Sequence, residues 1–455
     1  MYFYTSDTPG APQLNNTYGD FNNVINYILD GGTPNSVVSI EAIEPNKCKL
    51  FFSDTIPFTQ FQTFEVTGAV TSIYNTRYFV ESKNEELKYI ICYCETIGAN
   101  TPIDNSPNIK VRLFGCGMTK VFGGIENQRT VFKTENETYY RIDDRDFRPM
   151  VTPPVTINAT NNSWMKLARV CIADGFDSLD STSHRMYPYN PTRPTENFNP
   201  TGKYIGQTFV IYNRCVINNT STVNNATYKL SGQNSNNAGP MKWKIYADHR
   251  TLYIILYTAS DSGTFNRQSM SVYVFGEFDG IRQDIKNSIL YCNKSETYNE
   301  TYDGNIFGGL YSRGSDNTSP LFPSQYVNGI YQPCSIIFSD TNYNTVETSF
   351  IGGSGLSPTN SGSGGLLYPN PLDGGFYISD VLVKSSSIYF GKCNGIKFIN
   401  NYIGNNSIVA SEKIIDGSMI KIDNKFYILQ KTSATYGSDS TTANTLFTLY
   451  EISRY

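Results

Sequence analysis

The sequence predicts a mainly β protein built from several antiparallel β-sandwich or barrel-like modules, with one short N-terminal helix and long polar loops. Charged residues make up only 17% of the 455 residues, whereas aromatic residues make up 14%, including 34 Tyr and 27 Phe. Aromatic and β-branched residues favour strands, and the 36 Gly residues favour tight turns between them. Segments of this kind recur about every ten residues, a spacing typical of sandwiches and barrels.

The chain is long enough for two to four domains with proper cores, and we divide it into three. Residues 1–125 are predicted to form an N-terminal arm, a short helix and a β domain. Residues 126–300 are predicted to form a central β domain, and residues 301–455 a C-terminal β domain with a Gly/Ser-rich loop.

The N-terminal region begins as a turn-rich extended arm and continues with the one convincing helical pattern, from Phe21 to Leu29. Val24, Ile25 and Ile28 recur at the spacing of one helix face, and Gly31-Gly32 supplies the helix stop. Strand candidates follow at Val37–Ile43, Cys48–Phe52, Gln62–Val66, Arg77–Val80, Leu87–Tyr93 and Lys110–Phe114.

The central region alternates strand candidates with long polar connections, notably Met186–Pro194 and Asn218–Gly239. Loops this long and polar usually contact something or are disordered. The strand candidates are Thr130–Lys133, Tyr139–Ile142, Trp164–Ile172, Thr208–Val216, Trp243–Tyr246, Leu252–Tyr257 and Ser271–Phe275.

The C-terminal region has a Gly/Ser-rich segment at Gly352–Gly365, which predicts a flexible loop. Its strand candidates are Phe376–Val383, Ser387–Phe390, Ile396–Ile399, Met419–Ile422, Phe426–Leu429 and Leu446–Ile452.

The most informative segment, Met241–Tyr257, has strand composition interrupted by the polar turn Asp248-His249-Arg250-Thr251. A second strand follows and is predicted to end at Gly276 or Gly280. We expect Trp243 to anchor the core, and Asp248 with Arg250 to fix the turn by hydrogen bonding.

The nine cysteines are odd in number and lack the paired Cys-x-x-Cys spacing of a zinc site, so buried free thiols are expected. Cys92 and Cys94 share one face of a strand, which favours a core pair over a metal site. Sequons such as that at Asn136 would suit an exported glycoprotein, but an Asn- and Thr-rich chain produces them by chance. The amino terminus lacks an apolar leader, so we expect a soluble protein that is not exported.

Charge and hydropathy argue against two classes of partner. The net charge is −4 and no run of Lys or Arg occurs, so nucleic acid is not an expected ligand. No stretch approaches the roughly 20 apolar residues that a membrane-spanning helix needs, so membrane insertion is not expected either.

Candidate catalytic residues are few. Only two histidines occur, His184 and His249, which restricts general-base catalysis and histidine-rich metal sites. Ser178 stands in a sequence that resembles the Gly-Asp-Ser-Leu motif of esterases, but an inserted Phe breaks the motif and no Asp-x-x-His follows near the C-terminus. We therefore expect Ser178 to lie in a surface turn and the protein to be non-enzymatic.

Two acidic runs lack the alternating pattern of a calcium loop. Solvated or arginine-paired turns are the simpler interpretation, and no cofactor or metal is expected. The runs are Asp174, Asp177 and Asp180, and Asp143-Asp144-Arg145-Asp146.

Several short motifs follow one another along the chain: Ser6-Asp-Thr-Pro-Gly-Ala-Pro-Gln-Leu-Asn15, Thr119-Lys-Val-Phe-Gly-Gly124, Tyr140-Arg-Ile-Asp-Asp144, Trp243, Asp248-His-Arg-Thr-Leu-Tyr253 and Phe275-Gly-Glu-Phe278. Taken in order, they resemble a family of poorly characterised structural proteins encoded in the tail-gene clusters of tailed bacteriophages. The family pattern differs at Gly117-Met118, where its members usually have Gly-Trp. After Pro320 the match is loose.

The resemblance implies a virion structural protein of the tail, baseplate or neck, assembled in the bacterial cytoplasm in several copies. Its expected partners are other virion proteins and further copies of the same chain. One alternative is a receptor- or carbohydrate-binding tail protein, in which Tyr187 and Tyr189 would stack on sugar faces. Another is a hydrolase acting on the host envelope, against which the scarcity of histidines weighs.

Overall fold

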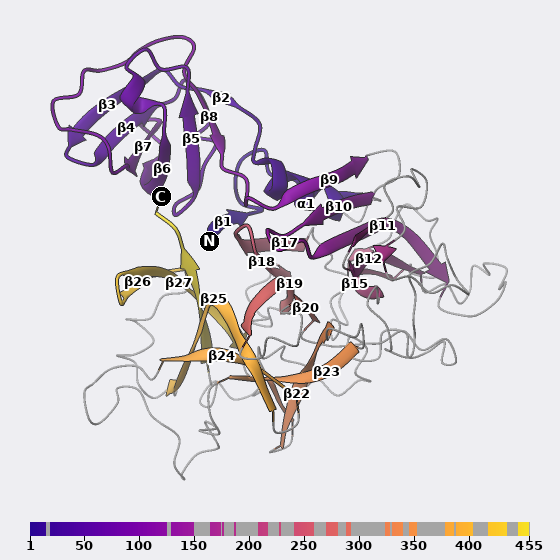
Figure 1. The fold of residues 1–455 in the computed structure, drawn as a ribbon. Coiled ribbons are helices and arrows are strands. Elements are labelled where there is room, and N and C mark those ends of the chain that lie inside the picture. Colours follow the sequence, from indigo (N-terminus) through magenta and orange to yellow (C-terminus); the bar gives the residue numbers. More distant parts are fainter. Residues whose placement is uncertain are drawn as a thin grey trace.

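The computed structural model of the protein describes residues 1–14, 19–124, 129–149, 164–173, 175–176, 186–187, 208–216, 227–228, 241–258, 270–280, 288–292, 324–327, 330–339, 345–352, 378–385, 388–403, 417–434 and 445–454. Strands make up 53% of the described part and helical segments 7%, which confirms the mainly β prediction. Every strand pairing is antiparallel, and none of the sheets in the described part is a closed barrel. Figure 1 shows these sheets arranged around the two chain termini.

A seven-stranded sheet comes from the N-terminal region, and it confirms the six strands predicted there. Buried and half-buried residues alternate along two of its strands, Lys47–Phe51 and Tyr89–Tyr93, as expected for a sheet with one face in a core. Its strands are β2 (Asn35–Ser36), β3 (Ser39–Glu44), β4 (Lys47–Phe51), β5 (Thr63–Thr67), β6 (Arg77–Asn84), β7 (Tyr89–Tyr93) and β8 (Lys110–Leu113), in the order β2-β8-β5-β6-β7-β4-β3. A 3-10 helix, η1 (Ser72–Tyr74), lies between β5 and β6.

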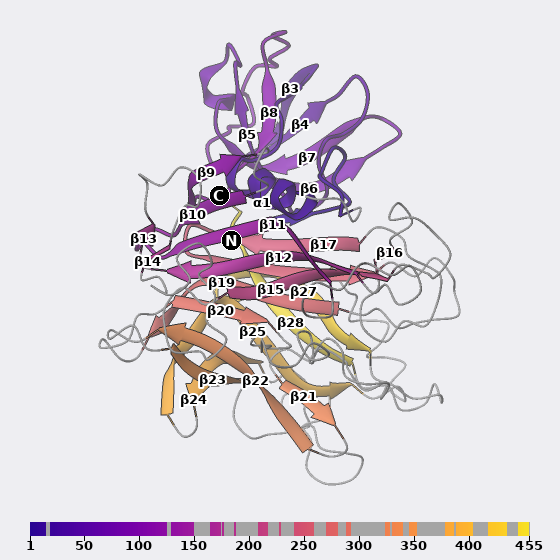
Figure 2. The ribbon, with the colours of Figure 1, turned by 90° about the vertical axis from the view of Figure 1, so that its right-hand side faces the viewer.

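A six-stranded sheet lies beside it (Figure 2). Its strands are β9 (Thr119–Gly124), β10 (Arg129–Lys133), β11 (Tyr139–Pro149), β12 (Trp164–Ala173), β15 (Thr208–Val216) and β16 (Thr227–Tyr228), in the order β16-β15-β12-β11-β10-β9. The pair β13 (Gly175–Phe176) and β14 (Met186–Tyr187) forms a separate two-stranded sheet.

The largest sheet has thirteen strands and draws on all three predicted domains, whose boundaries stay predictions. The strands are β1 (Tyr2–Thr5), β17 (Met241–Ala247), β18 (Thr251–Thr258), β19 (Met270–Gly280), β20 (Ser288–Cys292), β21 (Ser324–Val327), β22 (Ile330–Ser339), β23 (Thr345–Gly352), β24 (Ile378–Ser385), β25 (Ile388–Ile403), β26 (Met419–Ile422), β27 (Lys425–Ala434) and β28 (Thr445–Ile452). β19 branches: after Glu277 it leaves β20 and pairs with β25.

The single α-helix among the described residues, α1 (Asp20–Asp30), confirms the predicted helix. Val24, Ile25 and Ile28 are buried, and Gly31 ends the helix with a positive φ of 78°. A Cβ at Gly31 would lie 2.2 Å from the Leu113 carbonyl oxygen, so glycine is needed for close approach as well. The helix packs against β9, β10 and β11, as Figure 2 shows.

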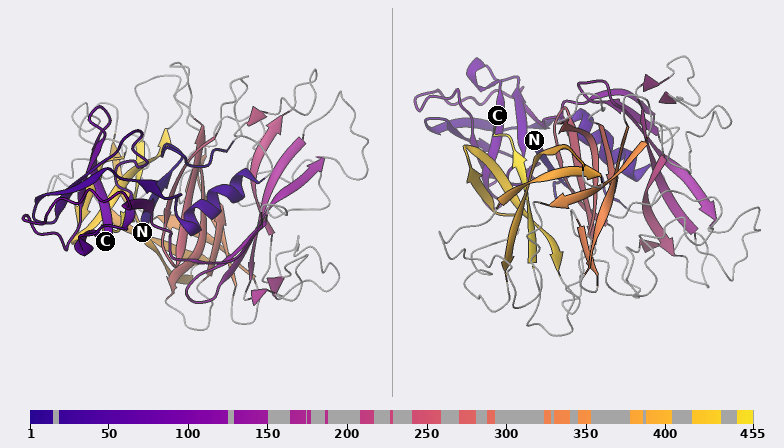
Figure 3. Two further views of the ribbon diagram at one scale, coloured as in Figure 1. Left: turned by 90° about the horizontal axis from the view of Figure 1, so that it is seen from above. Right: turned by 60° about the horizontal axis from the view of Figure 1, so that its bottom comes forward.

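Hydrophobic contacts join the sheets into two neighbouring cores. The larger runs from the seven-stranded sheet through α1 to Trp243, and the smaller contains Tyr246 and Tyr450, whose rings stack 4.2 Å apart. The first and last described segments meet here, because Ser453 N–H donates to the Met1 carbonyl at 2.6 Å (Figure 3). No helix in the described part is long and apolar enough to cross a bilayer.

The structure corrects several details. The predicted extended arm contains strand β1, which pairs with β17 across more than 230 residues of sequence, as Phe3↔Tyr246 shows. Asp144 lies in strand β11 rather than in a polar turn. Two predicted C-terminal strands are one long strand, β25, and four strands from β20 to β23 were not predicted. The Gly/Ser-rich segment lies outside the described residues from position 353 onwards.

Candidate functional site

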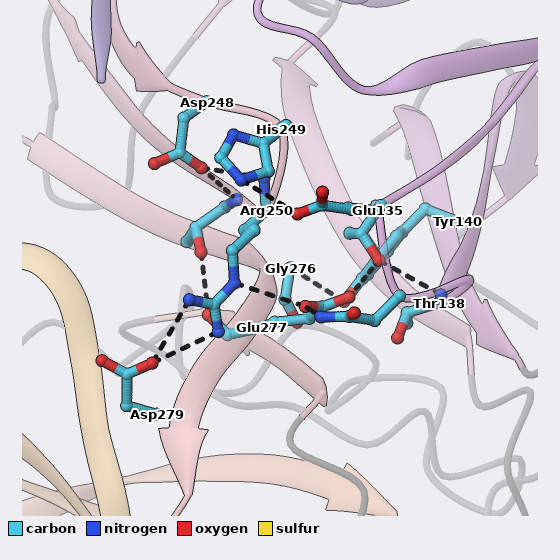
Figure 4. Close-up of polar contacts among 12 residues, drawn as sticks. Glu135, Thr138, Tyr140, Asp248, His249, Arg250, Gly276, Glu277 and Asp279 are labelled. Carbon is cyan, nitrogen blue, oxygen red and sulfur yellow. Dashed lines mark hydrogen bonds and ion pairs between the residues drawn. The ribbon is translucent and has the colours of Figure 1, made fainter. Parts of the chain in front are cut away.

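Residues of three of these motifs, from distant parts of the chain, meet in one place, which we call the polar junction (Figure 4). There the β10–β11 turn, the β17–β18 turn and the kinked strand β19 come together. The polar junction consists of Thr134, Glu135, Asn136, Tyr140, Asp248, His249, Arg250, Thr251, Gly276, Glu277 and Asp279.

The β17–β18 turn is fixed by Asp248, as predicted. Its Oδ1 accepts hydrogen bonds from the backbone N–H groups of Arg250 and Thr251, both at 2.8 Å. The backbone N–H of Asp248 donates to the Thr251 carbonyl at 3.0 Å and closes the turn. An aspartate that bonds the backbone two and three residues ahead makes a tight turn energetically favourable.

Strand β19 crosses this turn at Gly276, where φ is 132°. A Cβ at Gly276 would lie 2.2 Å from the Arg250 carbonyl oxygen, so only glycine fits. The Tyr140 hydroxyl accepts the Gly276 N–H at 2.7 Å and donates to the Gly276 carbonyl at 2.8 Å. One buried hydroxyl therefore satisfies both backbone groups where the strand bends.

Glu277 places a carboxylate inside the protein, with only 3% of the residue exposed. One oxygen accepts a short hydrogen bond from the Thr134 hydroxyl, and the other accepts the Asn136 amide at 2.5 Å. The Arg250 Nε lies 3.5 Å from the same carboxylate, at ion-pair distance. A buried carboxylate is tolerated only when it is paired and hydrogen-bonded, and both conditions are met here.

Exposed polar contacts extend the junction to the surface. The Arg250 guanidinium also reaches Asp279 Oδ1, at 3.2 and 3.3 Å. His249 Nε2 lies 3.1 Å from Glu135 Oε2, and the Glu135 N–H donates to the His249 carbonyl at 3.2 Å. These contacts connect the two turns at the surface.

Trp243 anchors the N-terminal arm as well as the core, where it is fully buried. Its indole N–H donates to the Pro12 carbonyl at 2.9 Å. Its backbone N–H donates to the Ser6 hydroxyl at 3.1 Å, and its carbonyl accepts the Ser6 N–H at 2.9 Å. The first motif of the resemblance is therefore attached directly to the tryptophan of a later one.

Asp144 connects β11 to the helix. The buried carboxylate accepts the N–H of Phe21 at 2.8 Å and of Asn22 at 3.4 Å, and its backbone carbonyl accepts the Gly19 N–H. A carboxylate at a helix N-terminus satisfies free backbone donors and interacts favourably with the helix dipole. Because Gly19 has no side chain to cap α1, this remote aspartate supplies the cap.

The side chains of the remaining predicted site residues are not described. Tyr187 lies in β14, which pairs with Gly175–Phe176, and the position of its side chain is not described. The other predicted positions that lie outside the described residues are Tyr189, Ser178, His184, Asp174, Asp177 and Asp180.

Five described cysteines are free and buried, as expected: Cys48, Cys92, Cys94, Cys116 and Cys393. Burial raises the pKa of Cys116 to about 12, so this thiol keeps its proton at neutral pH. Among the described residues, no group of three or more His, Cys, Asp or Glu is placed to hold a metal ion.

The roles of Glu277, Tyr140 and Asp144 were not predicted. Their motifs were visible in the sequence, but each residue acts on a partner more than 100 positions away. A charged residue between strand-forming aromatics, as in Phe275-Gly-Glu-Phe278, is the one local sign that a buried carboxylate is involved.

Comparison with known proteins adds no assignment. No family model matches the chain, and no curated protein matches it.

Proposed function

We propose that this protein is a non-enzymatic structural component of the virion of a tailed bacteriophage, located in the tail, baseplate or neck and present in several copies. The observation that carries the proposal is the polar junction. Nearly every motif that resembles the phage tail-cluster proteins contributes to it or to the adjoining contacts of Trp243 and Asp144.

The use of the polar groups supports an architectural role. Thr134, Tyr140 and Glu277 are buried, and their side chains bond one another or the backbone. A nucleophile or general base has to face a substrate, whereas these groups face the protein. The same motifs would be retained in related chains if they specify a fold on which assembly depends.

The proposed partners are other virion proteins and further copies of this chain, assembled in the cytoplasm of the bacterial host. Antiparallel sheets that share a core give the rigidity that a particle component needs, because buried sheets resist local opening. Neither nucleic acid nor a membrane is proposed as a partner.

The proposal is tested by locating the protein. The neighbouring genes should encode tail or neck proteins, and quantitative mass spectrometry of purified particles should find the chain at a fixed copy number above one. A glycan array probed with the purified protein distinguishes the structural role from the receptor-binding alternative, which predicts selective binding. A chain that is absent from particles, or a Ser178→Ala protein that assembles normally but leaves particles non-infectious, would contradict the proposed role.

A further inference from the structure

The seven-stranded sheet contains an open groove with a volume of about 610 Å³, between the start of β6 and the segment that follows β7. We call it the β6–β7 groove. Arg77 lies on one side, Glu95 and Thr96 on the other, and Arg454 forms part of the wall. This volume is within the range of about 300 to 1,000 Å³ that binding pockets show.

The groove exists because two paired strands separate. β6 and β7 pair as far as Phe79↔Tyr93, whereas the other side of β7 stays bonded toward β4, where Cys94 N–H donates to the Asn46 carbonyl at 2.8 Å. Continuing the register would place Glu95 opposite Arg77, and no such pair forms. The pairing of β6 with β7 therefore ends where the groove begins.

The open side of β6 presents backbone hydrogen-bonding groups. Val66 N–H donates to the Thr76 carbonyl, and Val80 N–H to the Gln62 carbonyl, so the even-numbered residues at this end of β6 face β5. In an antiparallel ladder the intervening residues face the other neighbour. The N–H and carbonyl of Arg77 therefore point into the groove, where none of the described residues pairs with them.

Local hydrogen bonds and close backbone contacts fix the walls of the β6–β7 groove. The Asn75 side-chain amide holds the backbone of Ala69, because its Oδ1 accepts the Ala69 N–H and its Nδ2 donates to the Ala69 carbonyl, both at 2.9 Å. Gly68 has φ 76°, and a Cβ there would lie 2.1 Å from the Asn108 carbonyl oxygen. A preformed opening lowers the entropy cost of binding.

Two charges of opposite sign flank the groove. The Arg77 guanidinium lies 3.8 Å from the centre of the Phe114 ring, and within the described part of the chain neither it nor Glu95 has a salt-bridge partner. The other charged groups are neutralised, because Glu65 bonds Arg112 and Arg454 bonds Glu81. A ligand that carries one charge alone would be attracted at one side and repelled at the other.

We propose that the β6–β7 groove binds an extended peptide segment of a partner protein, which adds a strand between β6 and the segment at Glu95 and Thr96. The main chain of the peptide would pair with the N–H and carbonyl of Arg77, as in other cases of strand addition. An acidic side chain of the peptide lies beside Arg77 and a basic one beside Glu95. A free edge inside a sheet is a ready template for such pairing.

The test uses an array of short random peptides, acetylated and amidated so that no terminal charge contributes, probed with the full-length protein. The expected result is enrichment of peptides that combine acidic and basic residues with β-branched ones. Fluorescence anisotropy with an enriched peptide should show binding about tenfold weaker or worse for Arg77→Ala. Lys83→Ala, at the far end of β6 and outside the groove, should bind like the wild type.

The double variant Arg77→Glu with Glu95→Arg should still enrich peptides from the array. In those peptides the acidic and the basic residue should have exchanged positions. If Arg77→Ala does not fold, Thr96→Trp fills the groove and leaves Arg77 in place, and it should abolish binding. An array without enrichment, or enriched binding that both Arg77→Ala and Thr96→Trp leave unchanged, would overturn the proposal. The groove is defined without reference to a virion, so either result leaves the proposed function to be decided by particle composition.

Discussion

The polar junction and the β6–β7 groove both contain arginine and glutamate side chains. The two regions differ in whether these charged groups are paired within the protein. In the junction, Glu277 is 3% exposed and contacts Thr134, Asn136 and Arg250. In the groove, Arg77 and Glu95 are exposed and have no partner of opposite charge among the described residues. The first arrangement stabilises the fold, and the second leaves interaction capacity for another molecule.

This difference gives a rule for interpreting the charged residues of this β protein. Removing a buried charged group that bonds distant segments destabilises the fold, because the partners of that group remain buried without it. An exposed charge with no partner contributes little to stability, so its removal should change binding only. Mutations in the two regions should separate accordingly.

The largest loss of stability is expected for Trp243→Ala. The indole is fully buried and donates to Pro12, so its removal leaves a cavity and a free carbonyl. We expect the free energy of unfolding to fall by about 3 to 5 kcal/mol, measured by denaturant unfolding. Trp243→Phe, which keeps a ring but removes the N–H, should lose much less, and equal losses would show that the ring does not anchor the core.

Arg250→Ala tests the buried carboxylate. It removes the one cation beside Glu277 in the described structure, and because Arg250 is partly exposed, we expect a loss of about 1 to 3 kcal/mol. Lys242→Ala is the matched control, since Lys242 pairs with Asp7 at the surface and should lose no more than about 1 kcal/mol. Indistinguishable unfolding curves for the two variants would remove the distinction between buried and exposed pairs.

Tyr140→Phe tests the strand kink. The substitution keeps the ring and removes only the hydroxyl, leaving the N–H and carbonyl of Gly276 without this partner. A loss of about 1 to 3 kcal/mol is expected. Tyr139→Phe on the neighbouring, half-buried position is the control and should be close to neutral; a neutral Tyr140→Phe would mean that water replaces the hydroxyl.

Cys116 should make stability depend on pH in the alkaline range. Its pKa is raised by burial from 9.0 to about 12, so above pH 9 the unfolded chain releases a proton that the folded state retains. Unfolding then becomes easier as pH rises, by up to roughly 1.4 kcal/mol per pH unit for this thiol. Cys116→Ala should therefore show a shallower decline between pH 9 and 11 than the wild type, and parallel curves would contradict the raised pKa.

The smallest effect is expected at His249. Both His249 and Glu135 are more than half exposed, so water screens the contact between their side chains. His249→Ala should change the free energy of unfolding by less than about 1 kcal/mol. A larger loss would place the histidine among the groups that hold the junction together.

The sequence predicted the local parts of this architecture well. Helix α1 and most strands of the N-terminal region follow from hydrophobic periodicity and glycine stops, which are local signals. The Asp248 turn was also predictable, since its hydrogen bonds span only two or three residues.

Long-range pairings were not predictable in this way. Nothing local to Tyr2–Thr5 distinguishes a strand paired with β17 from an extended arm, because the decisive partner lies more than 230 residues away. Asp144 was expected in a polar turn for the same reason, since the helix end that it caps belongs to another segment. The β6–β7 groove arises from a strand that fails to continue, and no residue type signals that.

The most direct test of the central claim compares junction variants inside the particle. Trp243→Ala, Arg250→Ala and Glu277→Gln are introduced into the gene of the proposed phage, and the copy number per particle is measured by quantitative mass spectrometry beside the infectious titre. An architectural junction predicts that titre falls only as incorporation falls, and that Trp243→Ala loses most of both. A Glu277→Gln protein that is stable and incorporated at the full copy number, in particles that do not infect, would contradict the account and show that the junction performs chemistry.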